Sequence, residues 1–315
     1  MNATTADRRI RALRPPKPAV DAWKAHGSLV EEERRPDGRV ERAFTVFLAG
    51  AECPFTCSFC DLWRWTLNGP TPAGALPAQL RDTLGAVSPP VPDRLKLYNA
   101  SNFFDPNAVP PEDVPAIASL AVPFSGVTVE SHARTVGERT LSFSGMLAGK
   151  LEVAMGLETI HPAAMGPLNK RLSLTRFDVA AGFLTDHEID LRVFVLLNAP
   201  YIPQDEEVEW AVRTVRYAAQ RGASVISIIP VRGGNGEVER LQSRGLFAPA
   251  KLAGLEAALD ACLDLWPTVV TADLWDAERI ATCRECGPAR VARLGRINLT
   301  GRAEPRIACS VCDGQ

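Results

Sequence analysis

From about residue 43 onward, short apolar runs alternate with longer stretches in which apolar residues recur at helical spacing. Six runs have the length of strands: Phe44–Ala49, Leu95–Asn99, Gly126–Glu130, Leu151–Leu157, Leu191–Leu197 and Ser224–Ile229. Helical patterns lie between them, for instance at Leu76–Val87, Pro111–Leu120, Phe177–Asp186 and Glu206–Arg221. Strands that are apolar almost throughout are typical of a parallel sheet covered by helices. The pattern predicts an α/β fold, a partial (β/α)6 barrel of the TIM type.

The same pattern divides the chain into three parts. Residues 1–42 are charged and contain several prolines, so we expect an extension that lies over the domain, with one short helix at Asp21–His26. Its basic residues are interpreted as a solvated arm rather than an RNA contact; they are Arg8, Arg9, Arg11, Arg14 and Lys17. Residues 43–280 form the predicted barrel, and residues 281–315 form a small module that carries four cysteines.

Composition narrows the class of protein. The chain has 315 residues, of which 46% are hydrophobic, and a net charge of −2, which favours one large domain with small additions. This nearly neutral net charge does not by itself indicate binding to nucleic acid or to an anionic membrane. No apolar run approaches the ~20 residues of a spanning helix, and the N-terminus lacks the apolar core of a signal peptide. We therefore expect a cytoplasmic protein whose eight cysteines bind metal rather than form disulfides.

Three cysteines follow the first predicted strand with the spacing C-x3-C-x2-C, at Cys53, Cys57 and Cys60. In parallel α/β barrels, chemistry gathers where strands end. Three thiolates can bind three irons of a [4Fe–4S] cluster and leave the fourth iron open. An open metal position is typical of a catalytic site. A zinc site, or three unrelated thiols, is the weaker alternative because zinc prefers four closed ligands.

With Phe59 before the last cysteine, this motif resembles the cluster motif of the radical S-adenosylmethionine (radical SAM) superfamily. The resemblance implies that SAM chelates the open iron through its amino and carboxylate groups and that Phe59 packs near its adenine. It also implies that one electron splits the sulfonium, and that the resulting 5′-deoxyadenosyl radical takes a hydrogen atom from the substrate. A reductant such as flavodoxin or ferredoxin would supply the electron.

Polar residues follow the next two predicted strands. Ser101 and Asn102 lie in a segment that resembles one in the elongator catalytic subunit and its relatives, which implies that both meet the amino end of SAM. An Asn-rich turn is the alternative. Glu130 and Ser131 end and follow the third predicted strand, and both are candidate SAM-binding residues. The resemblance implies that Glu130 contacts the ribose of SAM, whose hydroxyls can donate to a carboxylate, or another part of SAM. His132 departs from the Arg of the relatives, which leaves the SAM-binding role of Arg134 open.

The fourth and fifth predicted strands end in further candidate SAM-binding positions. Gly156-Leu157-Glu158 resembles the family's strand end, so Glu158 faces a SAM polar group or a substrate cation, with a salt bridge to Lys170 as the structural alternative. Leu197 ends the fifth strand, where backbone groups border the adenine in related proteins. Cys262 lies on an apolar helical stripe and is expected in the core.

The last four cysteines form two C-x2-C pairs, Cys283 with Cys286 and Cys309 with Cys312. This arrangement predicts one all-sulfur site in a zinc-ribbon-like module. Zinc is favoured, because a glycine follows each pair and amides there can turn toward thiolate sulfurs. A second iron–sulfur cluster stays open as the alternative.

We therefore interpret the chain as a radical SAM enzyme, a lyase or a transferase, closest to the elongator-like, archaeosine-lyase-like branch. That branch implies a modified tRNA base as substrate, whereas the near-neutral charge favours a small molecule. The alternative from another class is a non-catalytic iron–sulfur or zinc protein that binds nucleic acid or senses redox state.

Overall fold

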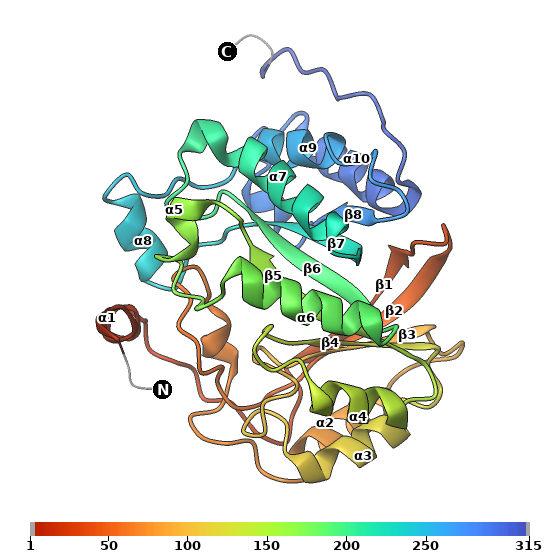
Figure 1. Ribbon diagram of the computed structural model, residues 1–315. Helices are drawn as coiled ribbons and strands as arrows, with labels where there is room; N and C mark the ends of the chain where they lie inside the picture. Colours follow the sequence, from red (N-terminus) through yellow and green to blue (C-terminus); the bar gives the residue numbers. More distant parts are fainter. Residues whose placement is uncertain (1–3, 313–315) are drawn as a thin grey trace.

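The computed structural model describes residues 4–312, and within this range eight strands form one continuous sheet in chain order. They are β1 (Gly27–Arg34), β2 (Val40–Phe47), β3 (Arg94–Tyr98), β4 (Gly126–Glu130), β5 (Lys150–Glu158), β6 (Asp190–Leu197), β7 (Ala223–Pro230) and β8 (Val269–Ala272). β1 pairs antiparallel with β2, and every later strand pairs in parallel with the strand before it. The sheet curls into a partial barrel (Figure 1), as predicted.

Helices cover the outside of this sheet. The described α-helices are α1 (Thr5–Ala12), α2 (Ala75–Gly85), α3 (Val114–Leu120), α4 (Glu138–Met146), α5 (Pro162–Met165), α6 (Leu174–Asp186), α7 (Glu207–Gln220), α8 (Glu237–Gln242), α9 (Leu252–Asp260) and α10 (Gly287–Thr300). Short 3-10 helices are η1 (Leu62–Trp65), η2 (Pro111–Asp113), η3 (Gln204–Glu206) and η4 (Ala277–Arg279). None of the helices in residues 4–312 combines the length and apolarity that crossing a membrane requires.

Strand β3 shows how the sequence separates the two faces of the sheet. Successive side chains of a strand point to opposite faces. Leu95 and Leu97 belong to the hydrophobic core that the helices cover, whereas Lys96 and Tyr98 line the interior of the barrel. The predicted core position Cys262 is also confirmed, at 1% exposure.

An ion-pair network fills the barrel interior near the amino ends of its strands. Arg192 Nε and Arg35 Nη1 donate to the two oxygens of Glu152, each at 2.8 Å. Glu33 of β1 pairs with Arg192 and Lys96. Burial alone would raise the pKa of Glu33, but these two cations lower it to about 2. Because the acidic and basic side chains of this network neutralise one another, we interpret them as structural contacts. The carboxyl ends of the strands, at the opposite end of the barrel, remain available for a site.

The six predicted strands correspond to β2–β7, and two further strands, β1 and β8, extend the sheet at its edges. The N-terminal helix also differs from the prediction. Asp21–His26 forms turns, whereas the helix lies at Thr5–Ala12. A capping box begins this helix: the Thr4 hydroxyl accepts from the Asp7 amide, and the Asp7 carboxylate accepts from the Thr4 amide.

Candidate functional site

Residues 48–61, which we call the cysteine loop, follow β2 and carry Cys53, Cys57 and Cys60. Other elements fix its course by bonding its backbone. The Ala49 amide donates to Gln79 of α2 at 2.8 Å, and the Ser58 amide donates to the Leu168 carbonyl at 2.9 Å. Asn235 Nδ2 donates to the Ser58 carbonyl at 2.8 Å. The three cysteines are therefore placed by contacts from distant parts of the chain.

The three thiols are free, half-buried and close enough to influence one another electrostatically. Burial raises the pKa of Cys57 to about 12 and also raises the pKa values of Cys53 and Cys60. Within residues 4–312, the sulfurs that converge tightly enough for a single ion are those of the C-terminal quartet, not these three. Wider spacing suits ligands that each bind a different iron of a cluster.

A side-chain donor, Asn102, and a cation, Lys170, lie near these sulfurs. Asn102 Nδ2 lies 3.3 Å from Cys53 Sγ, and Asn102 Oδ1 accepts from the His132 amide at 2.8 Å. The Lys170 ammonium lowers the pKa of Cys57 and so partly offsets the effect of burial. Buried thiolates need such donors or a metal, because burial penalises their charge. This donor set fits an anionic metal–thiolate centre.

His132 holds the cysteine loop against the end of β4. Its ring stacks on Phe55, with centroids 4.1 Å apart. Nδ1 accepts from the Arg134 amide and Nε2 lies 3.1 Å from the Lys170 carbonyl, so these partners assign the proton to Nε2. Burial lowers the pKa of His132 to about 3, with Lys170 adding to the effect. The ring is therefore neutral. Both of its nitrogens bond to backbone groups, and its face packs on Phe55 of the cysteine loop.

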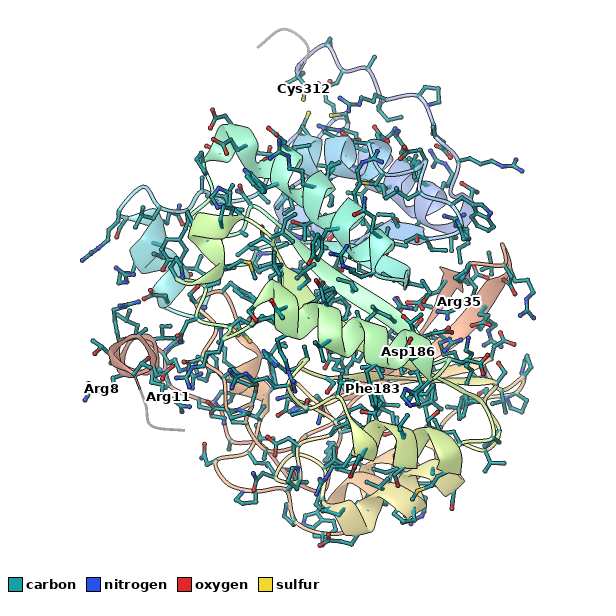
Figure 2. All side chains as sticks on the ribbon, viewed as in Figure 1. Arg8, Arg11, Arg35, Phe183, Asp186 and Cys312 are labelled. Atoms are coloured by element: carbon teal, nitrogen blue, oxygen red, sulfur yellow. The ribbon has the colours of Figure 1, made fainter. Side chains whose placement is uncertain are left out.

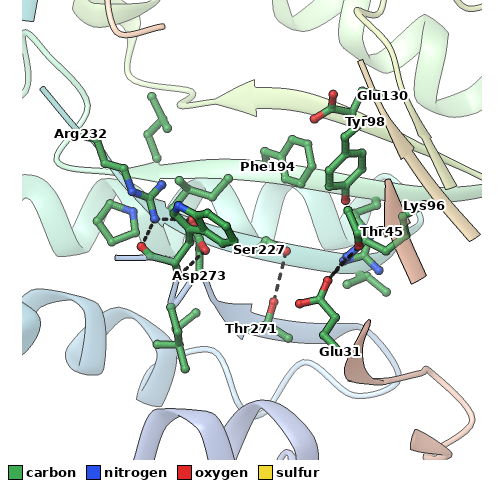
Figure 3. A pocket seen from close by; sticks show the side chains of 18 of the residues that line it. Glu31, Thr45, Lys96, Tyr98, Glu130, Phe194, Ser227, Arg232, Thr271 and Asp273 are labelled. Atoms are coloured by element: carbon green, nitrogen blue, oxygen red, sulfur yellow. Dashed lines mark hydrogen bonds and ion pairs between the residues drawn. The ribbon is translucent and has the colours of Figure 1, made fainter. Parts of the chain in front are cut away.

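A cavity of about 490 Å³ occupies the barrel interior beside the cysteine loop. We call it the lumen. Phe59, Cys60, Glu130 and Glu158 line it near the strand ends, together with the aromatic rings of Tyr98, Phe194 and Trp275. Figure 3 shows Arg232 and Asp273 at one end of the lumen and Lys96 with Glu31 at the other. The first of these pairs is joined at 2.8 Å, the second at 2.7 Å.

Glu130 faces the lumen from the end of β4. Burial raises its pKa to about 7, although Lys96 and the backbone amides of Asn99 and Ala100 favour the charged form. After the neighbouring strand β3, Ser101 Oγ and both polar side-chain atoms of Asn99 are buried without a hydrogen-bond partner in the described part of the chain. Buried polar atoms are rarely left unpaired. This strand end therefore has hydrogen-bonding capacity for a polar ligand.

Glu158 forms an ion pair with Lys170, Nζ to Oε1 2.7 Å. A side chain at Gly156 would collide with this pair, because a Cβ there would lie 2.0 Å from Glu158 Oε1 and 2.7 Å from Lys170 Nζ. The pairing of β5 with β6 is irregular at the same point. Glycine thus makes room for the pair at the mouth of the lumen.

Non-glycine residues adopt the left-handed backbone conformation at several strand ends. Ala100 follows β3 with a φ of 53°, Glu158 ends β5 with 69°, and Asn198 follows β6 with 62°. Such conformations are uncommon for residues with a side chain and gather at functional sites. They therefore mark the same end of the barrel as the cysteine loop.

Five other predicted SAM-binding positions do not line the lumen: Ser101, Asn102, Ser131, Arg134 and Leu197. Ser131 Oγ pairs with Thr135 Oγ1 at 2.7 Å, and the Arg134 side chain is exposed. Leu197 is fully buried, and its carbonyl accepts from the Val231 amide at 3.1 Å. The structure thus brings Phe59, Glu130 and Glu158 into one cavity with Cys60, whereas the other five predicted positions do not line it.

Asp61 and Tyr98 line the lumen, as do Asp273 and Trp275, and Asp7 bonds to the cysteine loop, but none of these five was among the predicted site residues. Asp61 directly follows Cys60, and burial raises its pKa. Tyr98 alternates with Leu97 at the end of a predicted strand, so strand periodicity could have placed it in the interior. Asp7 gives no such signal, because its partners are distant in sequence.

The C-terminal cysteines form a compact quartet. Cys283 Sγ lies 3.8 Å from Cys309 Sγ, Cys286 Sγ lies 3.7 Å from Cys312 Sγ, and the four sulfurs are all within 4.8 Å of one another. Backbone amides of Cys286 and Glu285 lower the pKa of Cys283 to about 7. Helix α10 begins directly after Cys286, so the quartet lies at one end of this helix. The four residues can bind one metal ion.

No protein-family model matches the chain, and no curated protein matches it. Elp3 of the archaeon Methanocaldococcus infernus, with an N-terminal deletion, is similar in structure, with 12% identity over 71% of this chain and 58% of that chain and a TM-score of 0.51. Methylornithine synthase (PylB) has 14% identity over 72% of this chain and 64% of that chain, with a TM-score of 0.52.

Both matches span less than two-thirds of the relative's length, and at such identities they show the fold alone. Escherichia coli coproporphyrinogen III oxidase (HemN), described as a radical SAM enzyme, gives a TM-score of 0.44 at 11% identity, covering 68% of this chain and 50% of its own. The chain shares a partial TIM-barrel fold with Elp3 and methylornithine synthase.

Proposed function

We propose that this protein is a radical SAM enzyme whose cluster ligands are Cys53, Cys57 and Cys60. One observation carries the proposal: the loop that carries the three thiols lines the lumen through Phe59 and Cys60, and Glu130 and Glu158 line the same lumen. A [4Fe–4S] cluster held there would supply the electron that splits the sulfonium of SAM into methionine and a 5′-deoxyadenosyl radical, which takes hydrogen from the substrate.

Residues that follow the strands at their carboxyl ends, together with Phe59 of the cysteine loop, would bind and orient SAM. Glu130, in its charged form, would accept hydrogen bonds from the ribose hydroxyls. Ser101 and Asn102 would meet the amino and carboxylate groups, which the unpartnered Ser101 hydroxyl supports. Phe59 would pack against the adenine. Glu158, already neutralised by Lys170, would receive a neutral or cationic group rather than an anion.

For the substrate we propose a small molecule held in the lumen, with a modified tRNA base as the second candidate. The net charge of −2 and the acidic groups around the cavity support the first, because binding an RNA backbone needs a basic footprint. The reaction type, lyase or transferase, depends on how the substrate radical decays.

Spectroscopy of reconstituted protein tests this assignment of the ligands. The parent enzyme, loaded anaerobically with iron and sulfide and then reduced, should give an EPR signal that changes when SAM is added. Cys57→Ala should lose the signal, whereas Cys262→Ala, in the core, should keep it. A signal that SAM does not alter would contradict the proposal.

For the C-terminal quartet we propose zinc. At a Zn–S distance of about 2.3 Å, a tetrahedral ion places its sulfurs ~3.8 Å apart, and the two measured pairs lie at 3.8 and 3.7 Å. Cysteines that each bind a different iron of a cube would stand farther apart. Metal analysis of protein purified without iron should find about one zinc per chain, and Cys286→Ser should lose it. Iron and sulfide in place of zinc would contradict this assignment.

A further inference from the structure

Helix α1 packs directly on the cysteine loop, although about forty residues separate the two in the chain (Figure 1). Asp7 accepts a hydrogen bond from the Thr56 hydroxyl, next to Cys57. Arg11 and Arg14 pair with Glu52, next to Cys53, at 3.3 and 2.7 Å. The helix therefore covers the loop at the residues that precede two of its cysteines.

The inner face of α1 is buried and firmly bonded. Asp7 is 4% exposed and Ile10 is 2% exposed. Asp7 also accepts from Asn169 Nδ2 at 2.9 Å and from Arg171. Arg9 pairs with Glu237 of α8 at 3.2 Å. These contacts hold the helix in one orientation, so its outer face is fixed as well.

The outer face of α1 is positive. Figure 2 shows Arg8 and Arg11 on the outside of the molecule at this helix. Arg8 forms no ion pair with any residue between 4 and 312. In the two ion pairs that arginines of α1 form with other elements at this face, the arginine is the more exposed partner: Arg11 is 48% exposed against 23% for Glu52, and Arg9 is 42% exposed against 0% for Glu237. Solvent therefore meets mainly the guanidinium groups, in a chain whose net charge is −2.

We propose that this face of α1, formed by Arg8, Arg9 and Arg11, is the docking surface for an acidic one-electron donor protein. The inference rests on the proposed function, in which one electron must reach the cysteine loop from outside for each SAM that is cleaved. The donor's reduced cofactor loses that electron, and the carbon–sulfur bond of SAM breaks on receiving it. A positive face over the loop attracts an acidic partner to the place where the transfer path is short.

The other use of a basic face, RNA binding, is less well supported. Phosphate backbones are bound by many cations, commonly with aromatic side chains that stack on bases. The exposed face of α1 offers three arginines and no aromatic residue. A cluster of three arginines is typical of the charged groups at the edge of a protein–protein interface, which steer an oppositely charged partner toward it.

The test compares two ways of reducing the same enzyme. 5′-Deoxyadenosine formation is measured with dithionite, a small reductant that needs no docking surface, and with reduced flavodoxin, an acidic flavoprotein. The variant is Arg8→Glu with Arg11→Glu. Arg8→Glu alone is a second variant, because Arg8 forms no ion pair within residues 4–312 that the change would remove. The matched control reverses two exposed arginines on other helices, Arg81→Glu of α2 with Arg139→Glu of α4.

With flavodoxin, kcat/KM for the donor should fall about tenfold or more in the α1 variants and lose most of its dependence on salt. The control pair should match the parent, and dithionite-driven turnover should be equal in all four proteins. Unchanged flavodoxin kinetics in the α1 variants, or equal loss in the control, would overturn the proposal. So would a parent that is active with dithionite but not with flavodoxin, or α1 reversal that weakens tRNA binding instead. No activity with dithionite would instead refute the proposed function itself.

Discussion

The carboxylate of Asp7 accepts a hydrogen bond from the hydroxyl of Thr56, so the N-terminal helix is tied to the loop that carries Cys53, Cys57 and Cys60. Asn169 completes this contact, because its Nδ2 donates at 2.9 Å to Asp7 and at 2.8 Å to the Thr56 carbonyl. The bonds from Thr56, Asn169 and Thr4 lower the pKa of Asp7 despite the opposing effect of burial. Asp7 is therefore a charged, buried group on which the loop depends.

Removing this carboxylate should loosen the cysteine loop. Asp7→Ala leaves Thr56, Asn169 and Arg171 without their shared acceptor, and a buried group left unpaired costs about 1–3 kcal/mol. We expect a lower Tm and less iron retained after desalting of the reconstituted protein. Asp37→Ala, at an exposed aspartate that pairs with Arg39, is the control and should retain iron like the parent. Equal iron retention in both variants would show that α1 does not support the loop.

A methyl group at position 156 should displace the Glu158–Lys170 pair. Gly156→Ala places its Cβ where the Glu158 carboxylate lies, and overpacking of this kind costs about 1–3 kcal/mol. SAM binding, measured by calorimetry on the reconstituted protein, should weaken together with thermal stability. Gly166→Ala is the matched control, because a Cβ there meets nothing within 4 Å. If both variants bind SAM as the parent does, the pair has no part in the site.

Glu130 should make the stability of the protein depend on pH. Its pKa is raised from 4.5 to about 7, so the folded state favours the protonated form. That contribution is complete below the pKa of the unfolded chain and is lost as pH rises through about 7. Glu130→Gln stays neutral, so the stability of the variant relative to the parent should grow by about 1–3 kcal/mol between pH 5 and 8.

Chemical denaturation of metal-free protein at several pH values measures this difference. The exposed Glu138→Gln change provides the control and should give a constant offset. A constant offset for Glu130→Gln as well would mean that the Glu130 carboxyl is not perturbed in the folded state.

Removing the metal from the C-terminal quartet should loosen α10. This helix packs against β1 and β8, and Asn298 bonds both backbone groups of Ala272, accepting from its amide and donating to its carbonyl. Loss of a structural metal commonly costs several kcal/mol. Cys286→Ser should therefore speed amide hydrogen exchange in α10 and β8, while β3 and β4 keep the rates of the parent. Unchanged exchange in α10 would show that the quartet does not hold the helix.

Much of the barrel could be predicted from the sequence, because β2–β7 each contain a short apolar run and helical patterns separate these runs. The spacing of the cysteines was likewise enough to predict both candidate metal sites. β1 could not be predicted, since it reads GSLVEEER, and its Glu31 and Glu33 point inward only because Lys96 and Arg192 neutralise them there. The role of Asp7 was also hidden. Its partners lie 49 and 162 residues away, and no local pattern reports contacts of that range.

The most direct test is anaerobic incubation of the reconstituted protein with SAM and dithionite, followed by mass spectrometry of the nucleoside products. We predict that the parent forms 5′-deoxyadenosine, that Cys53→Ala, Cys57→Ala and Cys60→Ala each form none, and that Cys283→Ala still forms it. If the parent forms no 5′-deoxyadenosine although its cluster is fully loaded, these three cysteines do not serve SAM cleavage and the account is wrong.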